Sequence, residues 1–318
     1  MQDNGRLMMP KKILPNAHGE WEDPDNRGNC LWIPEKTHKP GSANPDKNTW
    51  QEIMDAFGLL GINFEDLLPD FDPIRNGNEW KDEQPKSLVK FKITDKRATN
   101  FAEADRQAIK GTALKQKDME EFRYCYNLTW HEEYNTEEMR LVFAIVHDNV
   151  AHTGGIAVMK HSGCGSTKAE EGQMVEHPIL GTIWQKAPCL WSLGQQASNG
   201  WQGVISFSSE AEKRPNKNQL AAYIQMIEQK EALAQAITDG KKAYSAQLAA
   251  ETAVSEVDIL QSMSVTEIHF PLMQPNGRNC LSVLGESDWE PDKGWGVLLE
   301  EGEAGYKLLR VGSQGAVL

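Results

Sequence analysis

Three of the eight histidines, His131, His147 and His152, lie in one short stretch, residues 127–155. An imidazole with an unperturbed pKa of about 6.5 accepts a proton near neutral pH, so His131 is a candidate general base. Neutral imidazoles also bind divalent metal ions, and a bound metal stabilises negative charge on a phosphate oxygen. These residue types at this spacing therefore indicate metal-assisted hydrolysis.

The surrounding residues predict the elements that position these side chains. Residues 128–131 suit a short strand, residues 132–138 a polar loop, and residues 139–143 a second strand. A short helix over residues 144–151 should follow, ended by Gly154 and Gly155. His147 and His152 would lie roughly 140° apart on a continuous helix. They can converge only if the helix ends near Ala151 and the glycine-rich segment turns His152 back.

Three motifs in this stretch carry a resemblance to a known family. TWHEE at 129–133, MRLV at 139–142 and VHDNVAHTGG at 146–155 resemble the WHH group of HNH/endonuclease VII (ββα-metal) nucleases, found at the C-terminal ends of bacterial polymorphic toxins. Residues 90–108, KFKITDKRATNFAEADRQA, are similar to the segment that precedes the catalytic unit in these toxins. Two departures are Glu132, where the family often has a second histidine, and Phe143, near a position that is commonly proline.

The resemblance implies roles for individual residues. His131 would activate water, and His147 and His152 would hold one divalent metal ion (Mg, Mn, Zn or Ni). Glu132 would orient His131 or complete the metal shell, and Trp130 would pack the strand into the core.

Arg97 and Arg106 lie in the upstream segment, and Lys92 precedes them in a basic patch, so all three are candidate substrate-binding residues. Ordinary salt bridges on a helix surface are the alternative for the two arginines, and a solvated face of strand and helix is the alternative for Lys92. By analogy with the family, DNA is favoured over RNA as the substrate.

The composition describes an ordinary soluble globular chain, with 25% charged and 39% hydrophobic residues. The net charge is −13, of which −6 falls in residues 1–170, so only a local basic patch is open to nucleic acid. No apolar run is long enough for a membrane span, and the first twenty residues lack the apolar region of a secretory signal peptide. We therefore expect the toxin module to reach the cytoplasm of a target bacterium as the tail of a larger secreted effector. Five scattered cysteines argue against a zinc knuckle and a disulfide framework.

The rest of the first half predicts a strand within residues 28–34, a helix over 49–60 capped by Asn48 or Thr49, and a strand at 88–93. Two helices should follow, at 100–109 with Asn100 as the cap and at 118–124. His18 and His38 lie in a loop setting and are not expected to be ligands.

A turn-prone stretch over residues 164–173 predicts a linker, and Met174 resembles the first residue of a separate protein. The second half, 174–318, predicts a helical hairpin broken at Gly240 and about six strands: 179–184, 204–207, 266–270, 280–284, 294–299 and 306–311. Its pattern resembles that of small α+β immunity proteins. The resemblance implies that residues 174–318 form an immunity module that acts in the cytoplasm. An acidic inhibitor could place carboxylates where phosphates would bind. His177 and His269 are isolated in the sequence.

Together these patterns predict an α+β chain with two modules. Residues 1–163 would form an HNH-like nuclease, and residues 174–318 an immunity-like module with an antiparallel sheet that contacts it. One alternative is a non-catalytic binding protein with a decayed nuclease fold. Another is that the whole chain is an immunity protein. The sequence leaves open whether the two modules are naturally one chain or an engineered fusion.

Overall fold

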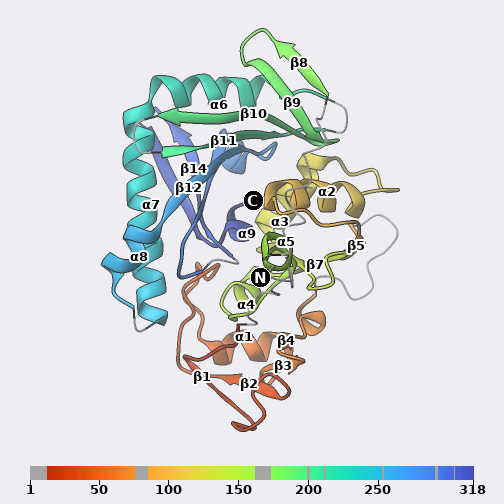
Figure 1. The fold of residues 1–318 in the computed structure, drawn as a ribbon, viewed down its shortest axis with the longest axis vertical. Helices are drawn as coiled ribbons and strands as arrows, with labels where there is room; N and C mark the ends of the chain where they lie inside the picture. The colour runs from red at the N-terminus through yellow and green to blue at the C-terminus, as the bar shows by residue number, and fades with distance from the viewer. Residues whose placement is uncertain are drawn as a thin grey trace, which may run out of the picture.

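The computed structural model describes residues 13–75, 85–161, 173–198, 201–210, 213–252, 254–290, 293–303 and 305–318. These residues form a mixed α+β fold with three sheets (Figure 1). The expected linker at 164–173 lies almost wholly outside the described residues. Within the described part, no helix has both the length and the apolar character needed to cross a membrane.

A small N-terminal sheet, at the bottom of Figure 1, shares a hydrophobic core with Val146 and Val150 of the histidine stretch. Its strands are β1 (Gly19–Trp21), β2 (Leu31–Pro34), β3 (Ile62–Glu65) and β4 (Leu68–Pro69), paired in that order. Helix α1 (Trp50–Phe57) packs on it and is capped by Thr49. The Thr49 hydroxyl accepts from the Glu52 amide, and the Glu52 carboxylate accepts from the Thr49 amide, which satisfies two free helix-end donors.

The central unit carries the three histidines. Its sheet has the order β5-β7-β6, with β5 (Leu88–Lys90), β6 (Leu128–Glu132) and β7 (Glu138–Phe143) all antiparallel. Its helices are α2 (Arg97–Ala108), α3 (Gln116–Cys125), α4 (Ala144–His147) and α5 (Gly155–His161). Both predicted strands of the histidine stretch are confirmed. Trp130 is 1% exposed, as its expected core role requires, and its indole donates to the buried Asp105 carboxylate at 2.7 Å.

Two predictions in this unit are wrong. Helix α4 spans four residues and ends at His147, well before Ala151, and Gly155 begins α5. A Cβ at Gly155 would lie 2.3 Å from the Glu133 carbonyl oxygen, so the glycine permits a close approach to the loop after β6. Asn100 is also no cap, because it lies inside α2 and its buried amide donates to the Thr94 carbonyl and the Glu132 carboxylate.

The second half forms one eight-stranded sheet in the order β15-β14-β13-β12-β11-β10-β9-β8. Its strands are β8 (Met174–His177), β9 (Gly181–Ala187), β10 (Leu190–Ser198), β11 (Trp201–Ser208), β12 (Ser264–Phe270), β13 (Cys280–Glu286), β14 (Trp295–Gly302) and β15 (Gly305–Gly312). All neighbours are antiparallel except β11 and β12, which are parallel. The parallel pair is joined by the helical crossover α6 (Lys217–Glu228), α7 (Lys230–Glu251) and α8 (Glu256–Ser262).

The sequence missed β8 and β10 and placed the helix break wrongly. Helix α7 runs through Gly240 without interruption, and the break lies at Gln229. A Cβ at Gly240 would lie 2.5 Å from Val297 Cγ1, so this glycine lets α7 approach the sheet. Its role is packing and not helix termination.

The large sheet is apolar on both faces, which brings the two halves together. Alternate residues of β13 and β14, such as Val283 and Val297, pack under α6, α7 and α8. The intervening Leu284 and Leu298 pack in a second core with Trp130 of the first half. Because successive side chains of a strand point to opposite faces, an isolated second half would expose this second set to water. The C-terminal helix α9 (Gln314–Val317) lies in the centre of the molecule between the sheet and α3 (Figure 1).

Polar contacts also join the halves. The Glu120 carboxylate on α3 accepts from the backbone amides of Leu272 and Met273 at 2.6 and 2.9 Å. Arg123 forms a buried two-point ion pair with Asp105 and donates to the Leu318 carbonyl at 2.9 Å. The docked surface is therefore both apolar and specifically hydrogen-bonded.

Candidate metal centre

The three histidines of the central unit converge on one point. His131 comes from β6, His147 ends α4, and His152 lies in the loop before α5. One ring nitrogen from each lies within 4.8 Å of the other two, which is close enough for one ion to contact all three. His131 Nδ1 and His147 Nε2 are 3.1 Å apart. The early end of α4 lets the chain turn His152 back toward His147.

Neighbouring oxygen atoms fix which nitrogens face this point. His152 Nδ1 lies 2.7 Å from the Val150 carbonyl, which only accepts, so Nδ1 carries the proton and Nε2 keeps its lone pair. His147 Nδ1 lies 2.8 Å from the Asp148 carboxylate, which orients that ring in the same way. Metal-binding histidines are commonly held by a carboxylate or carbonyl on the second nitrogen.

Burial keeps the three rings neutral. His131, His147 and His152 are between 4% and 8% exposed, and the Phe71 ring packs against each of them at centroid distances of 4.9–5.3 Å. Burial lowers the pKa of His131 to about 3 and holds the pKa values of His147 and His152 well below their usual range. Burial also raises the pKa of Asp148 to about 6. Neutral imidazoles are the form that binds a metal.

Glu132 lines the same cavity as the three histidines, but its carboxylate is held by other side chains. One carboxylate oxygen pairs with Arg97 at 3.2 Å, and the other accepts from Asn100 at 3.1 Å. Neither oxygen contacts an imidazole in this arrangement. Glu133, which the sequence did not single out, lies nearer to His131, with its carboxylate 4.0 Å from Nε2.

Two of the three predicted substrate-binding residues, Arg106 and Lys92, lie away from the histidine cavity. Arg106 pairs with Glu103 on the same helix at 2.5 Å, the salt bridge that was the alternative for this residue. Lys92 is exposed and lines a separate, larger hollow between the halves. Only Arg97 of the three lines the cavity that contains the histidines.

The second half closes this cavity. Lys293, Ser313 and Gly315 complete its walls, and its volume is about 20 Å³, enough for about one water molecule. The Lys293 ammonium donates to the carbonyls of Asp148 and Val150 at 2.9 and 3.0 Å, so it holds the loop between His147 and His152. The residues that the second half places here are therefore a lysine and small groups, in contrast to the carboxylates expected from the sequence.

The donor set fits a divalent ion. Three neutral imidazoles, two of them oriented by oxygen partners, match the ligands of open zinc sites, and imidazole also suits nickel and other transition metals. Among the described residues, this is the one group of three or more histidine, cysteine or carboxylate side chains arranged to hold a metal. Asp148 was missed by the sequence reasoning, although it directly follows His147 and is the residue that orients it.

Comparison with known families agrees with this location. Residues 62–154 match the model of the DNase/tRNase domain of colicin-like bacteriocin, a range that contains all three histidines. Residues 183–318 match a domain of unknown function (DUF6985), and this range contains Lys293, Ser313 and Gly315. Neither match covers half of the chain. No curated protein and no solved structure matched. The first half thus resembles a nuclease toxin domain, and the three-histidine cluster within it could hold a metal.

Proposed function

We propose that residues 1–163 form a metal-dependent nuclease toxin module of the HNH type, and that residues 174–318 form a module that inhibits it. The observation that carries this proposal is the convergence of His131, His147 and His152 inside the segment that matches a bacteriocin nuclease domain. The order β6, β7, α4 around the histidines is the order of a ββα-metal unit. DNA is the favoured substrate, and the target is the cytoplasm of another bacterium.

Each residue has a proposed role. His147 and His152 bind one divalent ion through Nε2, because their Nδ1 atoms are engaged by Asp148 and Val150. When bound, the metal supplies charge stabilisation for the scissile phosphate and the leaving oxygen. Arg97 lies at the edge of the same cavity, where its guanidinium would bind a phosphate oxygen once the cavity is open.

His131 has two candidate roles, and the geometry favours one. Its Nδ1 lies only 3.1 Å from His147 Nε2, a spacing suited to two ligands of one ion. We therefore propose His131 as a third ligand in place of the base role suggested by the sequence. The base role would then fall to Glu132, whose carboxylate is engaged by Arg97 and Asn100 while the halves are docked.

Inhibition by the second half is supported by the closed cavity. A volume of about 20 Å³ excludes a phosphodiester, so the docked arrangement is a closed state. Lys293 places a positive charge beside the histidines, which disfavours a dication there. Undocking would remove both effects, because Lys293, Ser313 and Gly315 all belong to the second half.

The rival function is a non-catalytic protein built on a decayed nuclease fold. The engaged Glu132 and the net charge of −13 favour it. The two functions differ in one respect, because only a nuclease gains activity when the cavity opens.

The test uses full-length variants that loosen the closed state. A Cβ at Gly315 would lie 2.7 Å from Thr129 Oγ1, so Gly315→Leu should push α9 away from β6. Lys293→Ala removes the clamp on the histidine loop, and Lys307→Ala, at an exposed position on β15, is the matched control. Circular dichroism and thermal unfolding would establish that each variant is folded.

Plasmid cleavage is then measured with Mg²⁺, Mn²⁺, Ni²⁺ and Zn²⁺. We expect Gly315→Leu and Lys293→Ala to cleave faster than the wild type, and Lys307→Ala to match the wild type. Adding His147→Ala to each should abolish the gain. Folded, open variants that bind metal but cleave neither DNA nor RNA with any ion would support the non-catalytic rival.

A further inference from the structure

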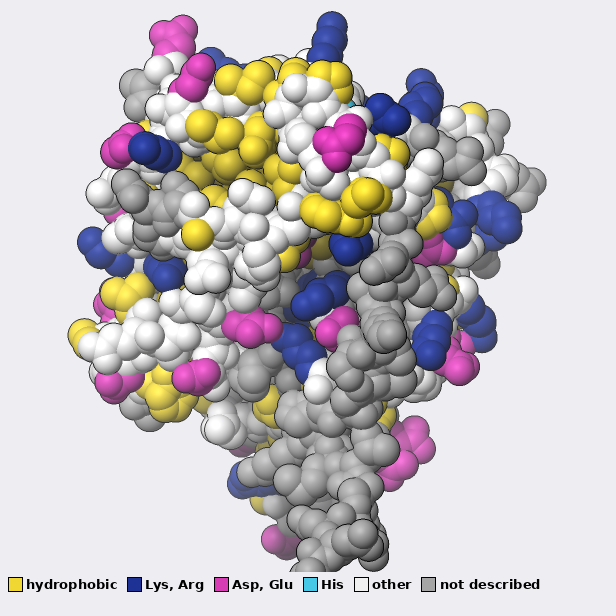
Figure 2. All heavy atoms as spheres, turned by 45° about the horizontal axis from the view of Figure 1, so that its top comes forward, with side chains coloured by type: hydrophobic (Ala, Val, Ile, Leu, Met, Phe, Trp, Pro, Cys, Tyr) yellow, Lys and Arg dark blue, Asp and Glu magenta, His cyan; other side chains and the backbone are white. Residues whose placement is uncertain are grey.

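A second and much larger hollow lies between the halves. Its volume is about 1380 Å³, and it is walled by the start of α2, by α5 and by strands β9 to β13 of the large sheet. Figure 2 shows it as a recess in one face of the molecule, with several basic side chains around it. It is separate from the closed histidine cavity, although Arg97 lines both.

The lining of this hollow has the opposite charge to the whole chain. Six basic side chains face three acidic ones, whereas the protein carries −13. The basic residues are Lys92, Lys96, Arg97, Lys160, Lys186 and Lys241. A local excess of positive charge with low-dielectric walls concentrates anions.

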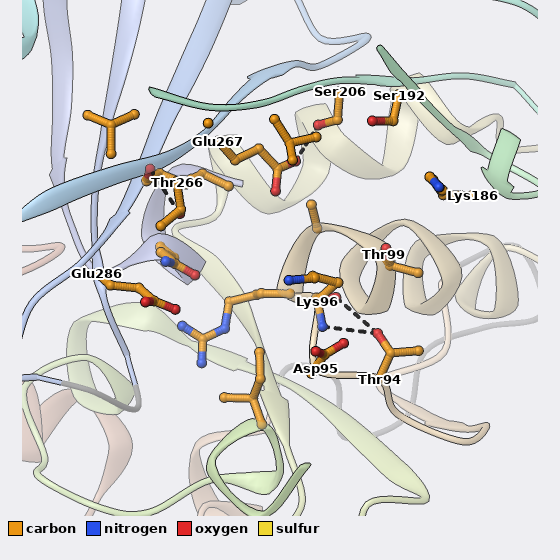
Figure 3. Close-up of a pocket in the computed structure, with 18 of the residues that line it drawn as sticks. Thr94, Asp95, Lys96, Thr99, Lys186, Ser192, Ser206, Thr266, Glu267 and Glu286 are labelled. Carbon is orange, nitrogen blue, oxygen red and sulfur yellow. Dashed lines mark hydrogen bonds between the residues drawn. The ribbon is translucent and has the colours of Figure 1, made fainter. Parts of the chain in front are cut away.

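Half of these basic groups are available to a ligand. Lys92, Lys96 and Lys186 are exposed, and none forms an ion pair within the described part of the chain. In contrast, Lys160 pairs with Glu286 at 2.8 Å, and Lys241 donates to the Met263 carbonyl at 2.8 Å. Figure 3 shows Lys96 and Lys186 on opposite walls, one from each half.

The remaining lining suits a ligand with both polar and flat apolar parts. Hydroxyl groups line the hollow at Thr94, Thr99 and Thr266 (Figure 3). Apolar surface comes from residues of both halves: Ile93, Ile156, Met159, Trp201, Val204 and Val265. An aromatic base stacks on such surfaces while lysines bind phosphate.

We propose that this hollow binds a phosphate-bearing ligand of nucleotide size. The volume exceeds the usual range for a small-molecule site, so it accommodates a nucleoside triphosphate or the end of a short oligonucleotide. Because its walls come from both halves, the ligand binds only the docked arrangement and stabilises it. The site neither uses the three histidines nor depends on nuclease activity.

The experiment uses the full chain carrying His147→Ala, so that no cleavage interferes. Isothermal titration calorimetry is done with ATP, inorganic tripolyphosphate and a 5′-phosphorylated thymidine dinucleotide. All three carry phosphate, so their affinities distinguish a site for a nucleotide, for phosphate alone and for the end of an oligonucleotide. We expect ATP or the dinucleotide to bind, with tripolyphosphate weaker because it lacks a base. Binding should weaken as NaCl rises from about 50 to about 300 mM, since the contacts are ionic. A rise in the unfolding temperature should accompany binding.

Charge reversal locates the site. Lys96→Glu combined with Lys186→Glu should weaken binding at least about tenfold. The matched control reverses Lys110 and Lys307, which are exposed on the two halves and do not line the hollow. Equal weakening by both pairs, or no binding of any of the three ligands at about 1 mM, would overturn the proposal. Because the titration is done without activity, its failure leaves the proposed nuclease untouched, and the reverse also holds.

Discussion

In the part of the chain that the structure describes, two regions bury histidine, and they do so differently. Burial lowers the pKa of His131 in the metal centre and of His269 in the large sheet to the same value, about 3. Both side chains are nearly inaccessible, at 5% and 3% exposed. By burial and pKa alone, the two positions are indistinguishable.

Their hydrogen-bond partners separate them. His269 has a serine hydroxyl on each ring nitrogen, Ser206 at 2.7 Å on Nδ1 and Ser208 at 3.1 Å on Nε2. Its hydrogen-bonding capacity is used within the sheet. In the metal centre, Asp148 and Val150 engage Nδ1 of His147 and His152, and the other nitrogens converge on one another, with His131 Nδ1 and His147 Nε2 hydrogen-bonded at 3.1 Å. A depressed histidine pKa therefore reports burial, whereas converging lone pairs indicate a ligand site.

The largest difference between the metal centre and the His269 region is expected when one imidazole is removed from each. In the opened variant Gly315→Leu, His147→Ala should lower the rate of DNA cleavage at least about 1000-fold, since a metal contributes several kcal/mol of charge stabilisation. It should also abolish metal binding in calorimetry. His269→Gln in the same background should keep both properties. Loss of metal binding in His269→Gln would contradict the distinction drawn between the two regions.

A smaller effect is expected from the group that orients an imidazole. Asp148→Asn removes the carboxylate that holds His147 Nδ1, and we expect metal affinity to fall about 10- to 100-fold. Titration of the opened variant Gly315→Leu, stripped of metal, measures this. His131→Ala distinguishes the two roles of His131. Losing a third metal ligand would lower the metal affinity, whereas losing a general base would lower only the cleavage rate, measured in parallel.

The pH dependence of stability should reveal His269 without any metal. The pKa of His269 is about 3 in the folded chain and about 6.5 in the unfolded chain, so between these values only the unfolded chain binds the proton. Its contribution is fully present above about pH 6.5 and is lost as the pH falls toward 3, by up to about 1.4 kcal/mol per pH unit. Urea unfolding at pH 7, 6 and 5 should show a shallower loss in His269→Gln than in the wild type. Identical slopes would mean that His269 is not buried as a neutral ring.

The smallest effects are expected at the outlying basic residues. Arg106→Ala breaks only a helix-surface pair with Glu103 and should change the free energy of unfolding by less than about 1 kcal/mol. If Lys92 contacts DNA, Lys92→Ala in the opened variant raises KM with little change in kcat, whereas Arg106→Ala leaves both unchanged. An equal rise in KM for both would place the substrate along α2 as well.

Local patterns predicted much of the central unit. The strands at 128–132 and 138–143 follow from short runs of β-branched and aromatic residues. Outside that unit, Thr49 caps α1, as one of the two predicted caps. The grouping of His131, His147 and His152 was also predictable, because a strand end and a short helix are close in the chain. In the second half, the missed strands β8 and β10 pair only with strands next to them in the sequence, so long-range contacts do not explain why they were missed. The continuous α7 is different, because Gly240 packs against the distant Val297, a contact that local patterns do not record.

The sequence by itself was enough to single out the three histidines of the candidate centre and to predict the general class of chemistry, because those side chains lie within about twenty-two positions of one another. Only the tertiary structure decided that Glu132 turns to Arg97, that Lys293 holds the histidine loop, and that the cavity is closed. The physical reason is sequence distance. Lys293 and Gly315 lie more than a hundred residues from the histidines, and they reach them only because the second half has a sheet with two apolar faces, one of which the first half must cover.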